Sequence, residues 1–202
     1  MKEKIHTFVL TTFILCGMMG FTSVSSAAVN HDAPSSHRSN ATDGTVKTID
    51  KRTGTDASGN VYYLVFISKP TILQGGEHAG HAYVVWGVED NTRQMSYAEA
   101  WGLHPDSQLQ ALTLGMVPGE MRDDGLNTSG YNRLIVQVDK SVYDSAHQKM
   151  QDWANQRTYQ LLTHDCLSFT IDIATIANLN VPDRTGFDNI PWNYLVSLIN
   201  AN

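Results

Sequence analysis

Cysteine is scarce in this chain of 202 residues, which contains only Cys16 and Cys166. A disulfide framework of the kind that stabilises small secreted domains needs more cysteines than this. Charged residues are also few, at 17% of the chain, and acidic residues outnumber basic ones by 20 to 14. An acidic balance argues against nucleic acid or anionic lipid as the main partner.

The N-terminus has the three features of a secretory signal peptide in their usual order. Lys2 and Lys4 supply positive charge, residues 8–21 are apolar with only threonine as polar interruption, and residues 25–28 are small. The apolar run falls short of the roughly 20 residues that span a bilayer, and no second run reaches that length. We therefore predict that residues 1–28 are removed and that the protein is secreted or periplasmic, with no stable membrane insertion. A retained membrane anchor is the alternative.

Removal of residues 1–28 would leave Cys166 as the one thiol and shift the net charge from -6 to about -7. The remaining length is normal for one domain with a core that is stable without disulfides. A lone thiol in an oxidising compartment is either buried and inert or kept for its chemistry. Composition leaves both interpretations open.

Residues 29–60 are rich in Ser, Thr, Asp, Asn and Gly and have almost no large apolar residue, which predicts a polar linker or flexible N-terminal segment. The folded domain is expected over residues 61–202. Its pattern predicts an α+β class, with a small antiparallel sheet packed against helices, and the Asp90-Asn91 turn predicts an antiparallel hairpin. The expected strands are 61–68, 81–90, 93–102, 134–138 and 158–162, and the expected helices are 139–155, one that starts at residue 166 and ends by 178–182, and 192–199.

Cys166 is expected in the first turn of a helix that Thr163, His164 or Asp165 caps. The free backbone N–H groups of a helix N-terminus favour an anion, so this position would stabilise a thiolate. Asp165 acts in the opposite direction, because it is a neighbouring negative charge. The alternative is a small buried hydrophobic residue at a helix start.

A nucleophilic cysteine needs a base, and histidine is the usual one because its pKa is near neutrality. His81 opens a predicted strand and is the best-placed candidate. His78 lies in the preceding Gly-rich loop, and His164 is close to Cys166 in sequence. A surface or capping role is the alternative for each of them.

Two segments together resemble a known superfamily: GHAYVVWG at residues 80–87 and YQLLTHDCLSFT at residues 159–170. They resemble the circularly permuted papain-like cysteine hydrolases and acyltransferases, which include NlpC-type cell-wall peptidases and lecithin retinol acyltransferase-like proteins. The resemblance covers about twenty residues. It implies a permuted papain-like architecture, with Cys166 as nucleophile and His81 as base. Members often have Asn immediately before the cysteine, where this chain has Asp165.

The resemblance leaves the third, orienting residue unassigned. We select Glu99, because a carboxylate can hold the imidazole tautomer and stabilise its cation; an exposed strand carboxylate is the alternative. The implied mechanism is covalent, through an acyl-enzyme on Cys166. Export favours a cell-wall peptide or another amide as substrate of a hydrolase. Acyl transfer or thioester hydrolysis at the same site is the alternative, and no cofactor is expected.

Two non-covalent functions compete with this interpretation. Glu77, His78, His81 and His104 could hold a metal ion, although two closely spaced histidines without a second ligand pair are a weak pattern, and we assign no metal. A non-catalytic binding protein could instead present an aromatic face to a ligand. The aromatic residues in question are Tyr62, Tyr63, Tyr83, Trp86 and Trp101.

Overall fold

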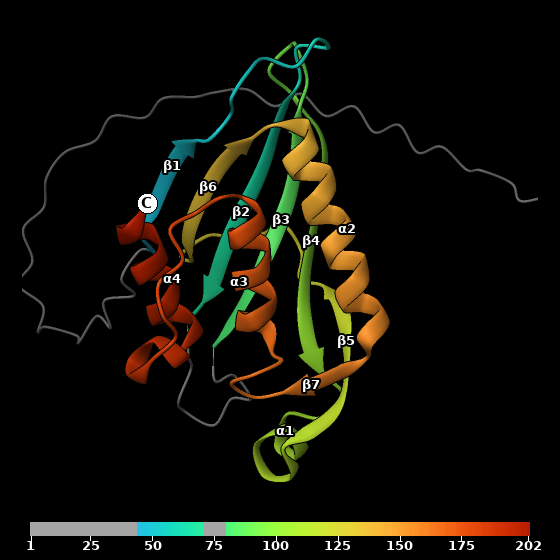
Figure 1. Ribbon diagram of the computed structural model, residues 1–202, viewed down its shortest axis with the longest axis vertical. Coiled ribbons are helices and arrows are strands. Elements are labelled where there is room, and N and C mark those ends of the chain that lie inside the picture. The colour runs from blue at the N-terminus through green and yellow to red at the C-terminus, as the bar shows by residue number, and fades with distance from the viewer. Residues whose placement is uncertain (1–43, 71–79) are drawn as a thin grey trace, which may run out of the picture. The chain divides into compact units, whose positions relative to one another are not determined.

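A computed structural model describes residues 44–70 and 80–202 of the chain, all within one of its two units, Asn40–Asn202. The predicted signal peptide at 1–28 lies outside the described residues, as do Glu77 and His78. The α+β class is confirmed. One seven-stranded sheet packs with four α-helices and a short 3-10 helix in the described part of the chain (Figure 1).

The sheet has the strand order β1-β6-β2-β3-β4-β5-β7, and it is mixed rather than purely antiparallel. β2, β3 and β4 form an antiparallel meander, and the turn after Asp90 joins β3 to β4 as the sequence predicts. β1 runs parallel to β6 at one edge, so the prediction of a small antiparallel sheet is corrected. The strands are β1 Val46–Asp50, β2 Val61–Lys69, β3 His81–Glu89, β4 Met95–Pro105, β5 Met116–Asp123, β6 Asn132–Val138 and β7 Thr158–Gln160.

β1 lies inside residues 29–60, where the sequence predicts a linker. Its side chains alternate between exposed and half-buried positions, so it has no buried residue to reveal it. Pairing with β6 holds it in the sheet, from Val46 opposite Arg133 to Asp50 opposite Gln137. The folded domain therefore begins before residue 61. A polar edge strand that is held by pairing with its neighbour is difficult to predict from its own composition.

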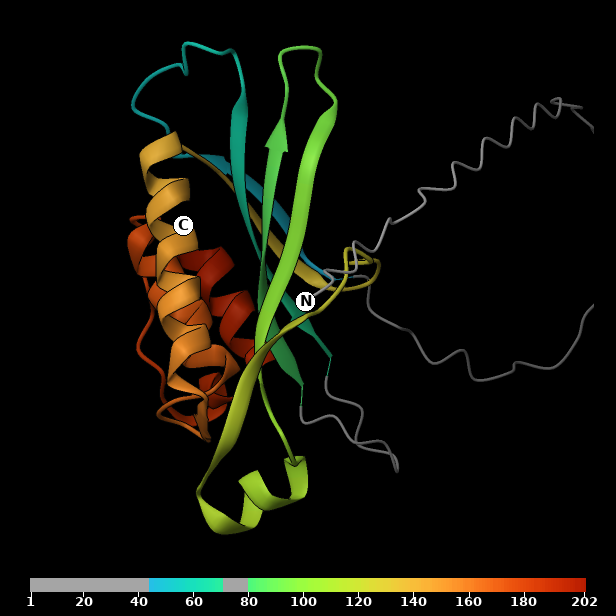
Figure 2. The same ribbon diagram turned by 90° about the vertical axis from the view of Figure 1, so that its right-hand side faces the viewer.

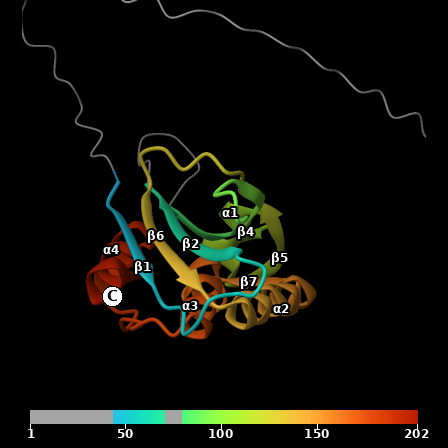
Figure 3. The ribbon, with the colours of Figure 1, turned by 90° about the horizontal axis from the view of Figure 1, so that it is seen from above.

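Three helices cover one face of the sheet, as Figures 2 and 3 show from the side and from above. They are α2 Lys140–Gln156, α3 Cys166–Ile176 and α4 Pro191–Ala201. α2 buries Ala146, Met150 and Trp153, whose spacing places them on one face of the helix. α3 packs against β3, while α4 packs against β6 and β2. None of the helices in the described ranges is both long and apolar enough to cross a membrane.

The alternation along β3 separates the two faces of the sheet. Ala82, Val84 and Trp86 belong to the large core beneath the helices. Tyr83 and Val85 belong to a smaller cluster with Ile67 and Ala100. His81, the first residue of β3, shares the parity of Tyr83 and Val85. It lies at the end of β3 that is not paired with β4.

Two elements between β4 and β6 escape prediction from the sequence. α1, Gln108–Leu114, buries only Ala111. β5 contains Pro118 and Gly119, and most of its residues are exposed. α1 has no periodic buried face. The buried positions of β5 alternate with exposed ones but fall on Val117 and Gly119, with Pro118 between them, so they do not give the apolar alternation by which strands are recognised in a sequence. β5 nevertheless matters for the site, because it leads directly into Asp124.

Candidate active site

His81 and Asp124 form a hydrogen bond at the end of the sheet where β3 begins. The distance from Nε2 of His81 to Oδ2 of Asp124 is 2.9 Å. Asp124 follows β5 directly, and its backbone N–H donates to the carbonyl of Ala100 on β4. Because a carboxylate only accepts, the neutral imidazole carries its proton on Nε2. Nδ1 of His81 is then the unprotonated nitrogen, and it is able to accept a proton.

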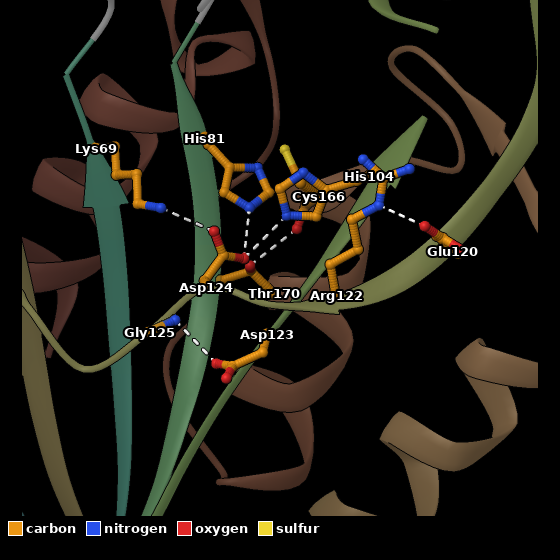
Figure 4. Close-up of polar contacts among 10 residues, drawn as sticks. All are labelled: Lys69, His81, His104, Glu120, Arg122, Asp123, Asp124, Gly125, Cys166 and Thr170. Atoms are coloured by element: carbon orange, nitrogen blue, oxygen red, sulfur yellow. Dashed lines mark hydrogen bonds and ion pairs between the residues drawn. The ribbon is translucent and has the colours of Figure 1, made fainter. Parts of the chain in front are cut away.

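Asp124 is the centre of a larger polar cluster (Figure 4). His104, on β4, places its Nε2 3.0 Å from the same Oδ2, and Lys69, at the end of β2, donates to Oδ1 at 2.8 Å. The Asp124 side chain is only 3% exposed. Burial alone would raise the pKa of this carboxyl, but hydrogen bonds from His104, His81 and Lys69 hold the pKa well below its usual range. Asp124 is therefore a fixed anion beside two imidazoles.

His81 is kept neutral by its surroundings. Burial lowers the pKa of His81, and the hydrogen bond and charge of Asp124 only partly oppose this effect. A neutral imidazole with one protonated nitrogen is the form that can act as a general base. The ring also stacks against Tyr83, with centroids 6.0 Å apart.

Gly102 on β4 leaves the space that the pair occupies. A Cβ at this position would lie 2.3 Å from Oδ2 of Asp124 and 2.5 Å from Nε2 of His81. Both separations are far below van der Waals contact. The missing side chain therefore allows the imidazole and the carboxylate to meet over the strand.

Cys166 is the first residue of α3, and the sequence prediction of its cap is confirmed. Asp165 is the N-cap residue, and its side chain accepts from the backbone N–H of Ser168 at 2.9 Å. The thiol is buried, with 5% of the residue exposed. It contacts the backbone of Ala82 and the hydroxyl of Tyr159. Cys166 therefore lies against β3 one residue away from His81.

The resting thiol is protonated, which corrects the expectation of a thiolate. Burial and the charge of Asp165 raise the pKa of Cys166 to about 12, and the Ala82 backbone, the charge of Arg184 and the Tyr159 hydroxyl only partly offset this. The favourable effect of the helix N-terminus is smaller than the cost of removing a charged sulfur from water. Ionisation of this thiol therefore needs a base.

Asp165 is itself neutralised by Arg184. Nη2 of Arg184 lies 2.5 Å from Oδ2 of Asp165, and Nη1 lies 2.8 Å from Oδ1. Burial would raise the pKa of Asp165, but this bidentate pair lowers it overall. Asp165 thus remains ionised, caps α3 and connects it to the segment before α4.

Cys166 and His81 lie where two strands of the sheet separate. The pairing of β3 with β4 extends only to Val84 opposite Trp101, while β4 continues to Pro105 beside β5. The first three residues of β3 therefore have a free edge toward β4, and the thiol meets this edge at Ala82. No hydrogen bond joins Cys166 to His81 within the described part of the chain. Apo catalytic pairs are often separated in this way before substrate arrives.

Glu99 does not reach His81. It lies opposite Trp86 in the β3–β4 register, five residues along β3 from His81. Its carboxylate contacts Nε2 of His147 on α2 at 2.9 Å. The carboxylate beside His81 belongs to Asp124 instead.

His164 and most of the aromatic residues considered from the sequence pack against other side chains away from His81. The ring of His164 stacks on Trp153 with centroids 4.1 Å apart, and burial lowers its pKa. Of the five aromatic residues considered for a ligand face, Tyr62, Tyr83 and Trp86 are buried in the core. They do not form an exposed binding face.

Asp124, His104 and Lys69 complete the cluster, and sequence reasoning did not assign them together. Asp124 stands in the run Arg122-Asp123-Asp124-Gly125, which has the composition of a turn. Its closeness to His81 depends on β5 pairing with β4, from Trp101 opposite Asp123 to Pro105 opposite Gly119. Recognition of β5 as a strand would have been the signal that placed this carboxylate beside β4.

Comparisons with known proteins give one structural likeness. No protein-family model matches the chain. No curated protein matches it either. A crystal structure of the type VI secretion system effector TseH is similar over 73% of this chain and 91% of that chain, with 12% sequence identity and a TM-score of 0.49. At this level of similarity the likeness adds nothing to the chemistry of the site, which depends on the side chains described above.

Proposed function

We propose that this chain is an exported cysteine hydrolase that cleaves an amide through Cys166, with His81 as general base and Asp124 as its orienting carboxylate. The observation that supports the proposal most directly is the 2.9 Å hydrogen bond between His81 and Asp124. It lies beside the point where the Cys166 thiol meets the backbone of Ala82. A nucleophile, a base and a group that fixes the base are thus assembled in one place.

The buried protonated thiol determines the order of proton transfer. Nδ1 of His81 accepts the proton of Cys166 as the sulfur attacks the carbonyl carbon of the substrate. Asp124 stabilises the imidazolium that forms. The same proton then passes to the leaving amine as the C–N bond breaks, leaving an acyl group on the sulfur. Water attacks this thioester with His81 again as base, which releases the acid and restores the thiol.

The start of α3 supplies donors for the developing oxyanion. Cys166 and Leu167 are its first two residues, and the backbone N–H groups of a first turn have no acceptor within the helix. The Asp165 side chain accepts from the N–H of Ser168 and not from the N–H groups of Cys166 and Leu167. Donors preorganised at this position would stabilise the tetrahedral intermediate.

The chain order of the site agrees with the permuted papain-like arrangement, since the histidine strand precedes the cysteine helix. Together with the predicted signal peptide at residues 1–28, this favours a cell-wall peptide or another extracytoplasmic amide as substrate. Transfer of the acyl group to an alcohol or amine instead of water would make the enzyme an acyltransferase. The same thiol chemistry serves both reactions, so the acceptor decides between them.

Trapping of the acyl-enzyme tests the proposal. Purified protein is mixed with soluble peptidoglycan fragments, and intact mass spectrometry follows adducts on Cys166 while chromatography follows cleaved peptide. We expect turnover in the wild type and in the His147→Ala control, whose imidazole lies beside Glu99 on α2. Cys166→Ser and His81→Ala should lose it. Equal turnover by Cys166→Ser would overturn the cysteine mechanism.

A further inference from the structure

We propose that His81, His104 and Asp124 also form a binding site for a divalent transition-metal ion such as Zn²⁺, and that the ion reversibly inhibits the thiol chemistry. The binding site stands on its own geometry, whereas the inhibition rests on the proposed function, in which His81 is the base. One ring nitrogen from each of His81 and His104 and one carboxylate oxygen of Asp124 lie within 4.8 Å of one another.

The separations of these atoms suit a shared ion. The two imidazole nitrogens lie 2.9 and 3.0 Å from Oδ2 of Asp124. Zinc bonds of roughly 2.0–2.2 Å to nitrogen and oxygen imply ligand atoms about 3.3 Å apart in a tetrahedron. Movements of a few tenths of an ångström would therefore admit the ion. Two imidazoles and one carboxylate are also a donor set that such ions prefer.

The strands hold the ligands in place before any ion arrives. His81 and His104 come from neighbouring strands, and their ring centroids are 4.2 Å apart. Lys69 donates to Oδ1 of Asp124, which leaves Oδ2 directed at the histidines. Outer hydrogen bonds of this kind orient metal ligands and fix how a carboxylate binds.

Access and charge favour an exchangeable ion over a permanent one. The side chains of His81 and His104 are 14% and 23% exposed, so neither ring is fully enclosed by the protein. Three protein ligands leave a fourth position for water. The Lys69 ammonium opposes a second positive charge nearby, which lowers the affinity. The site should therefore fill and empty with the concentration of the ion.

Inhibition follows from the tautomer of His81. In the metal-free site Nε2 carries the proton and Nδ1 accepts one from the thiol. An ion on Nε2 displaces that proton, so a neutral ring now carries its proton on Nδ1. Nδ1 then has no lone pair for the thiol of Cys166. The ion also replaces the hydrogen bond between Oδ2 of Asp124 and His81, so Asp124 can no longer stabilise the His81 imidazolium.

Direct binding of Co²⁺ and Zn²⁺ to the full chain, prepared without a polyhistidine tag, tests the site independently of activity. Titration calorimetry and Co²⁺ visible absorption should show one ion per chain for the wild type, Cys166→Ser and His147→Ala. His104→Ala and Asp124→Asn should weaken binding by at least tenfold, since even outer-shell changes cost 10–100-fold. Circular dichroism identifies any variant that has not folded, and either of the two variants is sufficient for the comparison.

Three results would overturn the site: no stoichiometric ion in the wild type, unchanged affinity in both folded ligand variants, or loss of binding in Cys166→Ser, which would place the ion on the sulfur. The regulatory step is read separately, as the rate of peptide cleavage with and without Zn²⁺, followed by removal with a chelator. Cleavage that Zn²⁺ leaves unchanged while the ion is bound would overturn the inhibition alone. Metal-dependent cleavage by Cys166→Ser would instead overturn the proposed cysteine mechanism and leave the binding site standing.

Discussion

His81 and Asp124 are 43 residues apart in sequence, and their side chains meet at 2.9 Å because β5 returns beside β4. Asp124→Asn should preserve the shape of this contact but replace the anion by a neutral amide. The imidazolium would lose its counter-charge, and the tautomer would no longer be fixed. We expect the rate of cleavage to fall by about 10²–10⁴-fold.

The matched control for this prediction is Asp144→Asn. Asp144 is exposed on α2 and pairs with Lys140 one turn earlier in the helix. It should retain the wild-type rate in the same kinetic assay. Equal cleavage rates for Asp124→Asn and Asp144→Asn would show that the Asp124 carboxylate has no role in the reaction.

Gly102→Ala tests whether the space over β4 is required. The added Cβ would lie 2.3 Å from Oδ2 of Asp124 and must push the carboxylate or the His81 ring aside. We expect at least a tenfold loss of cleavage rate and a loss of about 1–3 kcal/mol in the free energy of unfolding. Gly54→Ala is the control, because nothing lies within 4 Å of its added Cβ. Chemical denaturation and steady-state kinetics measure both effects.

Arg184→Met should destabilise the fold through Asp165. Asp165 is 2% exposed, and it would keep a buried charge without its bidentate partner. The expected loss is about 3 kcal/mol in the free energy of unfolding. Lys140→Met breaks an exposed pair with Asp144 and should cost under about 1 kcal/mol. The double substitution Asp165→Asn with Arg184→Met should recover part of the loss, and a double variant less stable than Arg184→Met would contradict the explanation.

The protonated thiol makes stability depend on alkaline pH. The pKa of Cys166 is raised from 9.0 to about 12 by folding, so only the unfolded chain releases this proton in that interval. The unfolded state then binds fewer protons, and stability falls as pH rises from about 9 toward 12, at about 1.4 kcal/mol per pH unit. The difference between wild type and Cys166→Ala isolates this effect from the tyrosines. Urea unfolding at several pH values measures it, and parallel curves would contradict the raised pKa.

The sequence predicts those parts of the fold that bury apolar residues periodically. β2, β3 and α3 each bury most of their residues, and all three were expected close to their observed bounds. β1, α1 and β5 depend on pairing or packing with neighbours and bury few side chains, so their own residues carry a weak signal.

The same distinction explains the site. Cys166 was located from local capping chemistry and His81 from its place at a strand start. Asp124 depends on strand register, which no local pattern contains. Glu99 was selected because a carboxylate can hold the imidazole tautomer, but in the β3–β4 register it lies opposite Trp86, five residues along β3 from His81.

The Asp124 cluster draws Lys69 from β2, His81 from β3, His104 from β4 and its carboxylate from the residue after β5. Those strands are adjacent in the sheet. A slip of one residue in any of them would turn its side chain to the opposite face. The cluster therefore forms only when all four strands are in their correct register. β7 pairs only with Met116–Pro118, so the end of β5 next to Asp124 has no outer strand partner. Fraying of that end alone would disrupt the cluster while β2, β3 and β6 stayed folded, so thermal inactivation should precede the loss of secondary structure.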